Sequence, residues 1–231
     1  MAEADMNLSP ALSNRQTLQI LSGPEARQVF MGIYDNILLT SGGTRRKSYL
    51  ICSANRGEGA STVALGLAMA AAEAWNQPVL LVDGNFSHPG VCEAFGLPDI
   101  QGLGDILAGG QDVKNVVRDT TIPHLQVMGA GVPPLNHVSM LGAPAFSNLL
   151  NGFAEAYPVI IIDGPPINGF PESVLYAAQV DRALMVVKSG ITRVPVVSSA
   201  LVRLAAGGCD HVDLILNQRT FPIPAWIYQR L

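Results

Sequence analysis

The sequence predicts an α/β fold in which a mostly parallel sheet carries helices on both faces. Short runs of Val, Ile and Leu alternate along the chain with segments whose apolar residues have helical spacing, and this alternation is typical of parallel sheets. Several of the runs are continuously apolar, as expected of strands buried on both faces. The chain has 231 residues, of which 48% are hydrophobic, so it can bury a large core.

The expected elements follow from these runs and spacings. The first helix opens at Pro24 and Glu25, where apolar residues begin to recur three and four positions apart and therefore share one helix face. The expected strands are 49–53, 79–83, 125–128, 159–163, 183–188 and 212–217. The further helices are expected near 61–75, 144–156, 172–178 and 194–206.

The chain is expected to hold one domain between two tails. Residues 1–20 are polar, and we expect them to form a flexible N-terminal tail. Residues 21–231 are expected to form a single domain that ends in a short apolar tail. That tail contains Trp226, Ile227 and Leu231, and it either packs on its own domain or reaches a partner.

Composition and charge exclude several classes of function. The formal net charge of −4 argues against a nucleic-acid-binding protein, which usually has a basic face. Cys52, Cys92 and Cys209 are too few and too scattered for a disulfide framework or a zinc site. The first residues lack the apolar core of a signal peptide, and no apolar run reaches the roughly 20 residues of a membrane span. We therefore expect a cytoplasmic protein.

Any ligand is expected beyond the carboxyl ends of the strands, where parallel sheets of this kind bind their ligands. Four loops follow expected strands there, at 54–61, 83–89, 163–166 and 189–192. The first has the features of a phosphate-binding loop, because its glycines let backbone N–H groups turn inward and a helix begins after it. Its candidate nucleotide contacts are Arg56, Gly57, Glu58, Gly59, Ala60, Ser61 and Thr62.

Two acidic residues follow buried strands near this loop. Asp83 ends the second expected strand and Asp163 ends the fourth. Carboxylates in this position hold Mg²⁺ in phosphate-binding folds, and the Ser61 hydroxyl is a third candidate ligand. The usual phosphate loop ends Gly-Lys-Ser/Thr, whereas the lysine position here is Ala60.

Six motifs occur in a fixed order along the chain. They are Gly-Glu-Gly-x-Ser-Thr at 57–62, Val-Asp-Gly-x-x-x-x-Pro at 82–89, Gly-Leu-Gly-Asp-Ile-Leu at 102–107, Met-Gly-Ala-Gly-x-Pro-Pro at 128–134, Ile-Ile-Asp-Gly-Pro-Pro at 161–166 and Leu-Ile-Leu-Asn at 214–217. In order and spacing the chain resembles the bacterial tyrosine kinases (BY-kinases) of polysaccharide export. That resemblance implies a P-loop NTPase-like fold of the MinD/ParA type, with ATP and Mg²⁺ as the cofactors of active members.

The departures from that family concern its catalytic positions. The lysine of the phosphate loop falls on Ala60, a second acidic residue falls on Asn85, and an arginine falls on Ser87, whereas Asp83 and Asp163 are retained. Loss of one oriented donor to developing charge costs about 10²–10³ in rate. The resemblance therefore implies a degenerate member, in which we expect no catalytic residue and no resident cofactor.

Purely structural roles stay open for these residues. The 54–62 loop is also consistent with a plain strand-to-helix turn, and Asp163 with a carboxylate that only holds this loop. Arg56 could supply the missing positive charge. We expect Lys188 to be a solvated lysine at a strand end.

The resemblance also bears on assembly. The family's ring-forming Glu-x-x-Arg-x-x-Arg pattern falls on Gln28, Met31 and Tyr34, so we expect a monomer or dimer rather than an octameric ring. Met31 and Tyr34 are expected to be exposed and free to make a different contact. The family's C-terminal tyrosine cluster is reduced to Tyr228, a candidate phosphorylation site or docking contact.

These expectations combine into one functional hypothesis. The chain is a scaffold or regulator of exopolysaccharide or capsule assembly, peripheral at the inner membrane through a Wzz-like polysaccharide co-polymerase. The alternatives are an active tyrosine autokinase or a MinD/ParA-like ATPase that binds ATP, with Mg²⁺ held by Ser61, Asp83 and Asp163. A spatial regulator of division or flagella is a further alternative.

Overall fold

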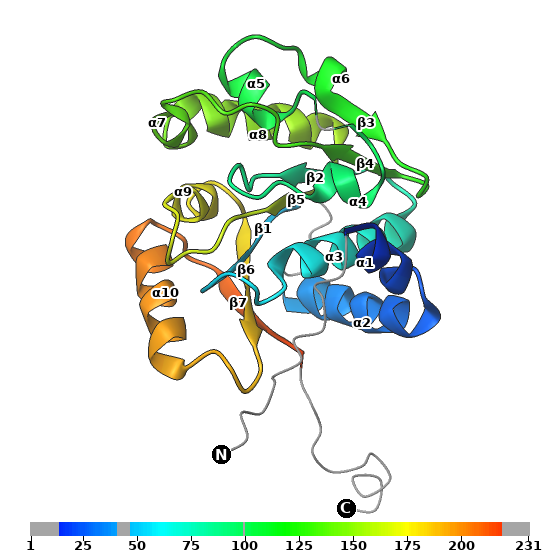
Figure 1. Cartoon of the computed structure of the whole chain (residues 1–231), viewed down its shortest axis with the longest axis vertical. Helices are drawn as coiled ribbons and strands as arrows, with labels where there is room; N and C mark the ends of the chain where they lie inside the picture. The colour runs from blue at the N-terminus through cyan, green and yellow to red at the C-terminus, as the bar shows by residue number, and fades with distance from the viewer. Residues whose placement is uncertain (1–13, 41–46, 99, 219–231) are drawn as a thin grey trace, which may run out of the picture.

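A computed structural model describes residues 14–40, 47–98 and 100–218 of the chain. Within these residues, seven strands form one sheet in the order β3-β4-β2-β5-β1-β6-β7, drawn in Figure 1. The strands are β1 (Lys47–Ser53), β2 (Val79–Asp83), β3 (Val117–Asp119), β4 (Leu125–Met128), β5 (Val159–Asp163), β6 (Arg182–Lys188) and β7 (Val212–Asn217). The α/β fold and the predicted strands are confirmed.

The sheet is parallel except at one edge. The six strands β4, β2, β5, β1, β6 and β7 are neighbours in that order and pair in parallel. The edge strand β3 pairs with β4 in the antiparallel direction. The sequence did not predict β3, because its three residues include Arg118 and Asp119 and lack an apolar run. This short polar edge leaves the predicted parallel core intact.

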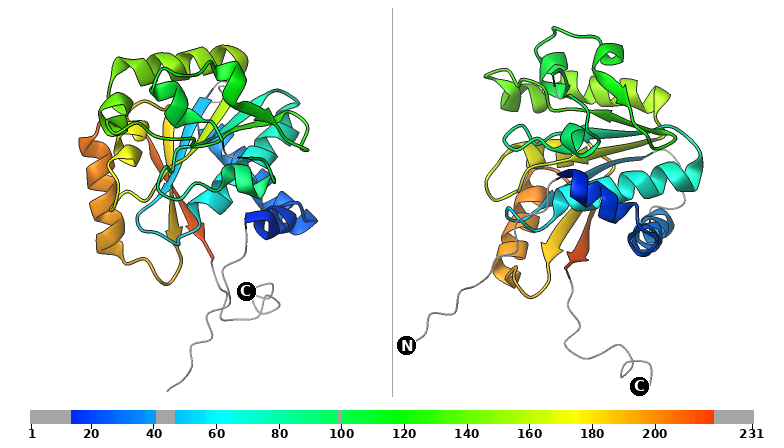
Figure 2. Two further views of the ribbon diagram at one scale, coloured as in Figure 1. Left: turned by 45° about the horizontal axis from the view of Figure 1, so that its top comes forward. Right: turned by 45° about the vertical axis from the view of Figure 1, so that its right-hand side comes forward.

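Helices cover both faces of the sheet (Figures 1 and 2). One face carries α1 (Asn14–Leu21), α2 (Pro24–Thr40) and α3 (Ala60–Trp75), and the other carries α8 (Pro144–Ala156), α9 (Glu172–Ala177) and α10 (Val194–Ala206). Ile161 faces the first layer, and its neighbours Ile160 and Ile162 face the second. Successive residues of one strand are therefore apolar because each face is a core.

Short helices lie in the connections between these elements. They are α4 (Val91–Ala94), α5 (Leu103–Leu107), α6 (Val113–Val116) and α7 (His137–Leu141). Each spans four or five residues, too few for a helical period to stand out in the sequence. They were not predicted.

Part of the predicted N-terminal tail is helical. Residues 14–21 form α1, and Leu21 at its end is buried in the core beneath α3. The sequence 14–20 is polar enough to resemble a tail, but one helix face contacts its neighbours and stabilises it. Residues 1–13 and the C-terminal segment 219–231, with Trp226 and Tyr228, lie outside the described residues.

The expected exposure of two residues of α2 is wrong. Tyr34 is 1% exposed, and Met31 is partly buried against the same core. Both lie on the face of α2 that packs toward α3 and the sheet, so only Gln28 of the three ring positions is exposed. Met31 and Tyr34 therefore stabilise the helix layer.

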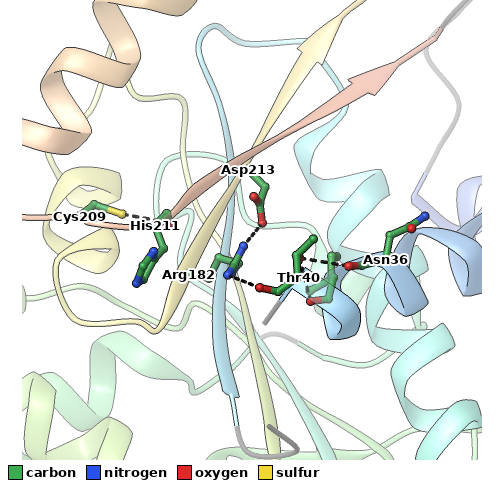
Figure 3. A network of polar contacts seen from close by, with 7 residues as sticks. Asn36, Thr40, Arg182, Cys209, His211 and Asp213 are labelled. Atoms are coloured by element: carbon green, nitrogen blue, oxygen red, sulfur yellow. Dashed lines mark hydrogen bonds and ion pairs between the residues drawn. The ribbon is translucent and has the colours of Figure 1, made fainter. Parts of the chain in front are cut away.

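The C-terminal end of α2 is fastened to the sheet by polar contacts (Figure 3). Arg182 at the start of β6 donates to the Asp213 carboxylate at 2.5 Å and to the carbonyl oxygen of Thr40 at 3.2 Å. The Thr40 hydroxyl in turn donates to the carbonyl oxygens of Asn36 and Ile37. These bonds satisfy carbonyl groups that a helix end leaves unpaired.

None of the helices in the described ranges is both long and apolar enough to cross a bilayer.

Candidate nucleotide site

The first loop connects β1 to α3 in the conformation that its glycines permit. Gly57 has φ +83° and Gly59 has φ +93°, values that other residues adopt only with strain. A Cβ atom on Gly59 would lie 2.2 Å from Nδ2 of Asn217. That amide donates to the carbonyl oxygen of Glu58 at 2.9 Å, so the end of β7 holds the loop directly.

A cavity of about 200 Å³ lies at the N-terminus of α3, and we name it the α3 cavity. The helix begins here without a side-chain cap, so N–H groups of its first turn are available to a ligand. The cavity is lined by Ser53, Arg56, Gly57, Gly59, Ala60, Ser61, Thr62, Asn85, His88, Gly164, Pro166 and Phe170. All the predicted loop contacts except Glu58 belong to this lining.

The side chain of Glu58 is turned into the protein and not toward a nucleotide. It is 4% exposed. Its Oε2 accepts from the Asn55 N–H at 3.0 Å, and its Oε1 accepts from the Thr192 hydroxyl at 2.6 Å. The side chain of Glu58 therefore joins the first loop to the loop after β6. A contact of its backbone N–H group with a nucleotide stays a prediction.

Asp83 uses its carboxylate to shape the second loop. Its Oδ1 accepts from the Asn85 N–H at 3.1 Å, and its Oδ2 accepts from the N–H groups of Gly90 and Val91 at 2.8 and 3.0 Å. The group is fully buried. These donors hold the turn after β2 and the start of α4, so the expected metal ligand already has backbone partners on both oxygens.

Of the two degenerate positions in the second loop, Asn85 and Ser87, only Asn85 reaches the α3 cavity. Asn85 lines the α3 cavity, and its Oδ1 accepts from the His88 N–H at 3.2 Å. Ser87 is exposed and does not belong to the lining. His88 and Phe170 line the cavity although the sequence did not single them out. His88 could have been found from its place in the same loop as Asn85, whereas nothing in the sequence marked Phe170.

Asp163 lies beside Asp83 in the sheet register but has a different environment. Its side chain is 2% exposed, and its Oδ1 has no hydrogen-bond partner among the described residues. Burial and the neighbouring Asp83 charge raise the pKa of Asp163 well above its usual range, while a hydrogen bond from Ser61 lowers it in part. Without a cation nearby, this carboxylate is a buried and incompletely paired acid.

These groups decide what the site could hold. A divalent cation fits Ser61 and the free oxygen of Asp163, because Mg²⁺ prefers oxygen ligands. An anion fits the first turn of α3. A triphosphate would in addition need a fixed cation, and residue 60 supplies a methyl group. In the described part of the chain, no three His, Cys, Asp or Glu side chains gather into a metal-binding group.

A second cavity lies on the other side of the first loop. It encloses about 370 Å³ beside the N-terminus of α10, and we name it the α10 cavity. Lys188 lines this cavity and not the α3 cavity, whereas Arg56 and Gly57 line both. Lys188 therefore lines a different cavity from the one that residue 60 lines.

No family model matches the chain. The tyrosine-protein kinase YwqD of Bacillus subtilis is 30% identical to it over 185 residues, which cover 80% of this chain and 78% of YwqD. The chain belongs to the bacterial tyrosine kinase family. Another BY-kinase, the tyrosine-protein kinase CpsD of Streptococcus agalactiae, is 28% identical over 197 residues, which cover 84% of each protein.

Solved structures agree with this membership. The crystal structure of the chimerical protein CapA2B2 matches this BY-kinase family member with a TM-score of 0.81 and 28% identity, over 91% of this chain and 92% of that one. MinD from Pyrococcus horikoshii, complexed with Mg-ADP, matches with a TM-score of 0.62 and 22% identity, over 80% of this chain and 76% of MinD. The likeness to MinD concerns the fold alone, and the predicted P-loop NTPase-like fold is confirmed.

Proposed function

We propose that this BY-kinase family member is catalytically degenerate and acts as a scaffold or regulator in exopolysaccharide or capsule assembly. The observation that carries the proposal is the absence of a basic side chain at residue 60, which lines the α3 cavity. Ala60 opens α3 where the family has a lysine, and the buried Asp163 has an oxygen without a partner in the described structure. Without a lysine at this position, the first loop lacks the fixed positive charge that contacts the phosphates and stabilises the charge that develops during transfer.

The size of the expected loss supports a non-catalytic role. Phosphoryl transfer depends on positioning and on charge stabilisation, and one lost donor costs about 10²–10³ in rate. Ala60, Asn85 and Ser87 together remove a cation, an acid and an arginine from the family pattern. Such losses are not additive, but the first alone leaves little turnover.

The proposed partner is an inner-membrane polysaccharide co-polymerase of the Wzz type, with the chain held at the cytoplasmic side of the membrane through that partner. The family resemblance supports this part of the proposal. Co-purification from cells tests it, because the scaffold should recover the co-polymerase. Recovery of division or flagellar proteins instead would support a spatial regulator.

Isothermal titration with ATP and Mg²⁺ tests the degeneracy. The wild-type chain should release no binding heat and hydrolyse no ATP, whereas Ala60→Lys should bind ATP. Ala60→Met is the matched control, because it adds a chain of similar length without charge, and it should not bind. If Ala60→Lys also fails to bind, the loop geometry does not suit a nucleotide.

An active kinase is the second candidate, and one observation favours it. Arg56 lines the α3 cavity, and its guanidinium has no partner among the described residues. If Arg56 supplies the missing charge, the wild-type chain will label its own tyrosine from ATP, and both Arg56→Ala and Asp163→Asn will abolish the labelling. That result would overturn the degenerate scaffold.

A further inference from the structure

The α10 cavity concentrates positive charge in an acidic protein. Three basic side chains line it, those of Arg56, Lys188 and Arg193. The ion pairs of the described residues are Arg27–Glu73, His137–Glu172 and Arg182–Asp213, so none of them neutralises this cavity. The three side chains have no hydrogen-bond partner in the same part of the structure.

The one carboxylate among the lining residues, that of Glu58, already accepts hydrogen bonds from the protein. Glu58 belongs to the lining, but both of its oxygens accept hydrogen bonds, from Asn55 and from Thr192. The Thr192 hydroxyl also accepts from the Lys188 N–H at 3.2 Å. Glu58 thereby joins the two walls of the cavity, one from the first loop and one from the loop after β6. These partly buried hydrogen bonds hold the cavity in shape.

The location of the cations is electrostatically unfavourable for the free protein. Arg193 is the N-cap residue of α10 and makes no side-chain cap bond. The N-terminus of a helix already carries partial positive charge, and three like charges around one cavity repel one another. The Glu58 carboxylate offsets one of the three charges, and the excess of positive charge that remains attracts anions.

The rest of the lining indicates what the anion carries. Ile191 is 68% exposed and lies on the cavity with Val196, so one wall offers apolar surface. A volume of about 370 Å³ lies in the range of small-ligand sites and exceeds what a free phosphate ion fills. Arginine and lysine bind phosphate oxygens with charge-assisted hydrogen bonds.

We propose that the α10 cavity binds an organic phosphate monoester, with its phosphate against Arg56, Lys188 and Arg193 and an aromatic body against Ile191 and Val196. Two sources share this chemistry, a phosphotyrosine side chain and a nucleoside monophosphate. The inference does not depend on the proposed function, because Lys188 and Arg193 do not line the α3 cavity.

Titration calorimetry of the full chain with O-phospho-L-tyrosine and with AMP tests the proposal, in EDTA so that no Mg²⁺ complex forms. At least one ester should bind saturably, and the tighter of the two identifies the source. Lys188→Ala and Arg193→Ala should each weaken that binding about tenfold or more. Arg203→Ala removes an exposed charge at the far end of α10 and should leave the affinity unchanged.

Three results would overturn the proposal. One is that neither ester binds. Another is that binding survives Lys188→Ala and Arg193→Ala in variants whose circular dichroism matches the wild type. The last is that inorganic phosphate binds as tightly as the esters, because the apolar wall would then contribute nothing.

Discussion

The two cavities on either side of the first loop share Arg56 and Gly57 but differ in the number of basic side chains that line them. The α3 cavity is lined by one basic side chain, Arg56, and residue 60 contributes a methyl group where the family has a lysine. In the α10 cavity three cations have no partner in the described structure, and the one acid is used to join the walls. The backbone of a phosphate-binding loop is therefore separable from the charge that gives it a ligand.

Moving one lysine from the α10 cavity to the α3 cavity should reverse which cavity binds its ligand more tightly. We expect this change in relative affinity to be the largest of the predicted effects. The double variant Ala60→Lys with Lys188→Met keeps the number of charges but shifts one from the α10 cavity to the α3 cavity. A hydrogen bond to a charged group contributes about 1.5–3 kcal/mol. The ratio of the Kd values for ATP and for the phosphate monoester should change by about 10²–10⁴, measured by titration calorimetry.

The matched control is Ala60→Met with Lys188→Met, which removes the lysine without replacing it. It should bind neither ligand well. If the two double variants behave alike, charge does not distinguish the cavities, and the comparison fails.

Asp83→Ala should give the next largest effect, because Asp83 and Asp163 differ in how their oxygens are paired. The change leaves the buried N–H groups of Asn85, Gly90 and Val91 without their acceptor. Each unsatisfied group costs about 1–3 kcal/mol, so the free energy of unfolding should fall by about 3–5 kcal/mol in urea denaturation. Asp83→Asn, which keeps one acceptor oxygen, should lose less, and equal losses would contradict this explanation.

Thr192→Val should loosen the α10 cavity at nearly constant side-chain shape. It removes the hydroxyl that donates to Glu58 at 2.6 Å, and a buried carboxylate oxygen without its donor costs about 2 kcal/mol. Thermal unfolding measures the loss, and Thr192→Ser, which keeps the hydroxyl, should retain most of the stability. A stable valine variant would show that Glu58 does not hold the walls together.

Asp163→Asn should have the smallest effect and the opposite sign. Burial and the Asp83 charge raise the pKa of Asp163, so the folded state binds its proton more tightly than the unfolded state. The wild type therefore loses stability as the pH rises from about 4 through that raised pKa. The variant should be more stable by about 0.5–2 kcal/mol at pH 7, and the gain should shrink toward pH 4. A gain that does not depend on pH would exclude this cause.

The sequence predicted the fold better than the site. Continuous Val, Ile and Leu runs predicted the parallel strands because each residue of such a strand faces a core. The inward turn of Glu58 could not be predicted, since its partner Thr192 lies 134 positions away. The burial of Tyr34 likewise depends on the packing of α2 against its neighbours, and β3 is too short to leave a pattern.

The amide of Asn217 that holds the carbonyl oxygen of Glu58 has a mechanical consequence. Asn217 is the last residue of β7, so a shift of that strand end would displace the residue that fastens the glycine loop. Such a shift would move the first loop whether or not a ligand occupies either cavity.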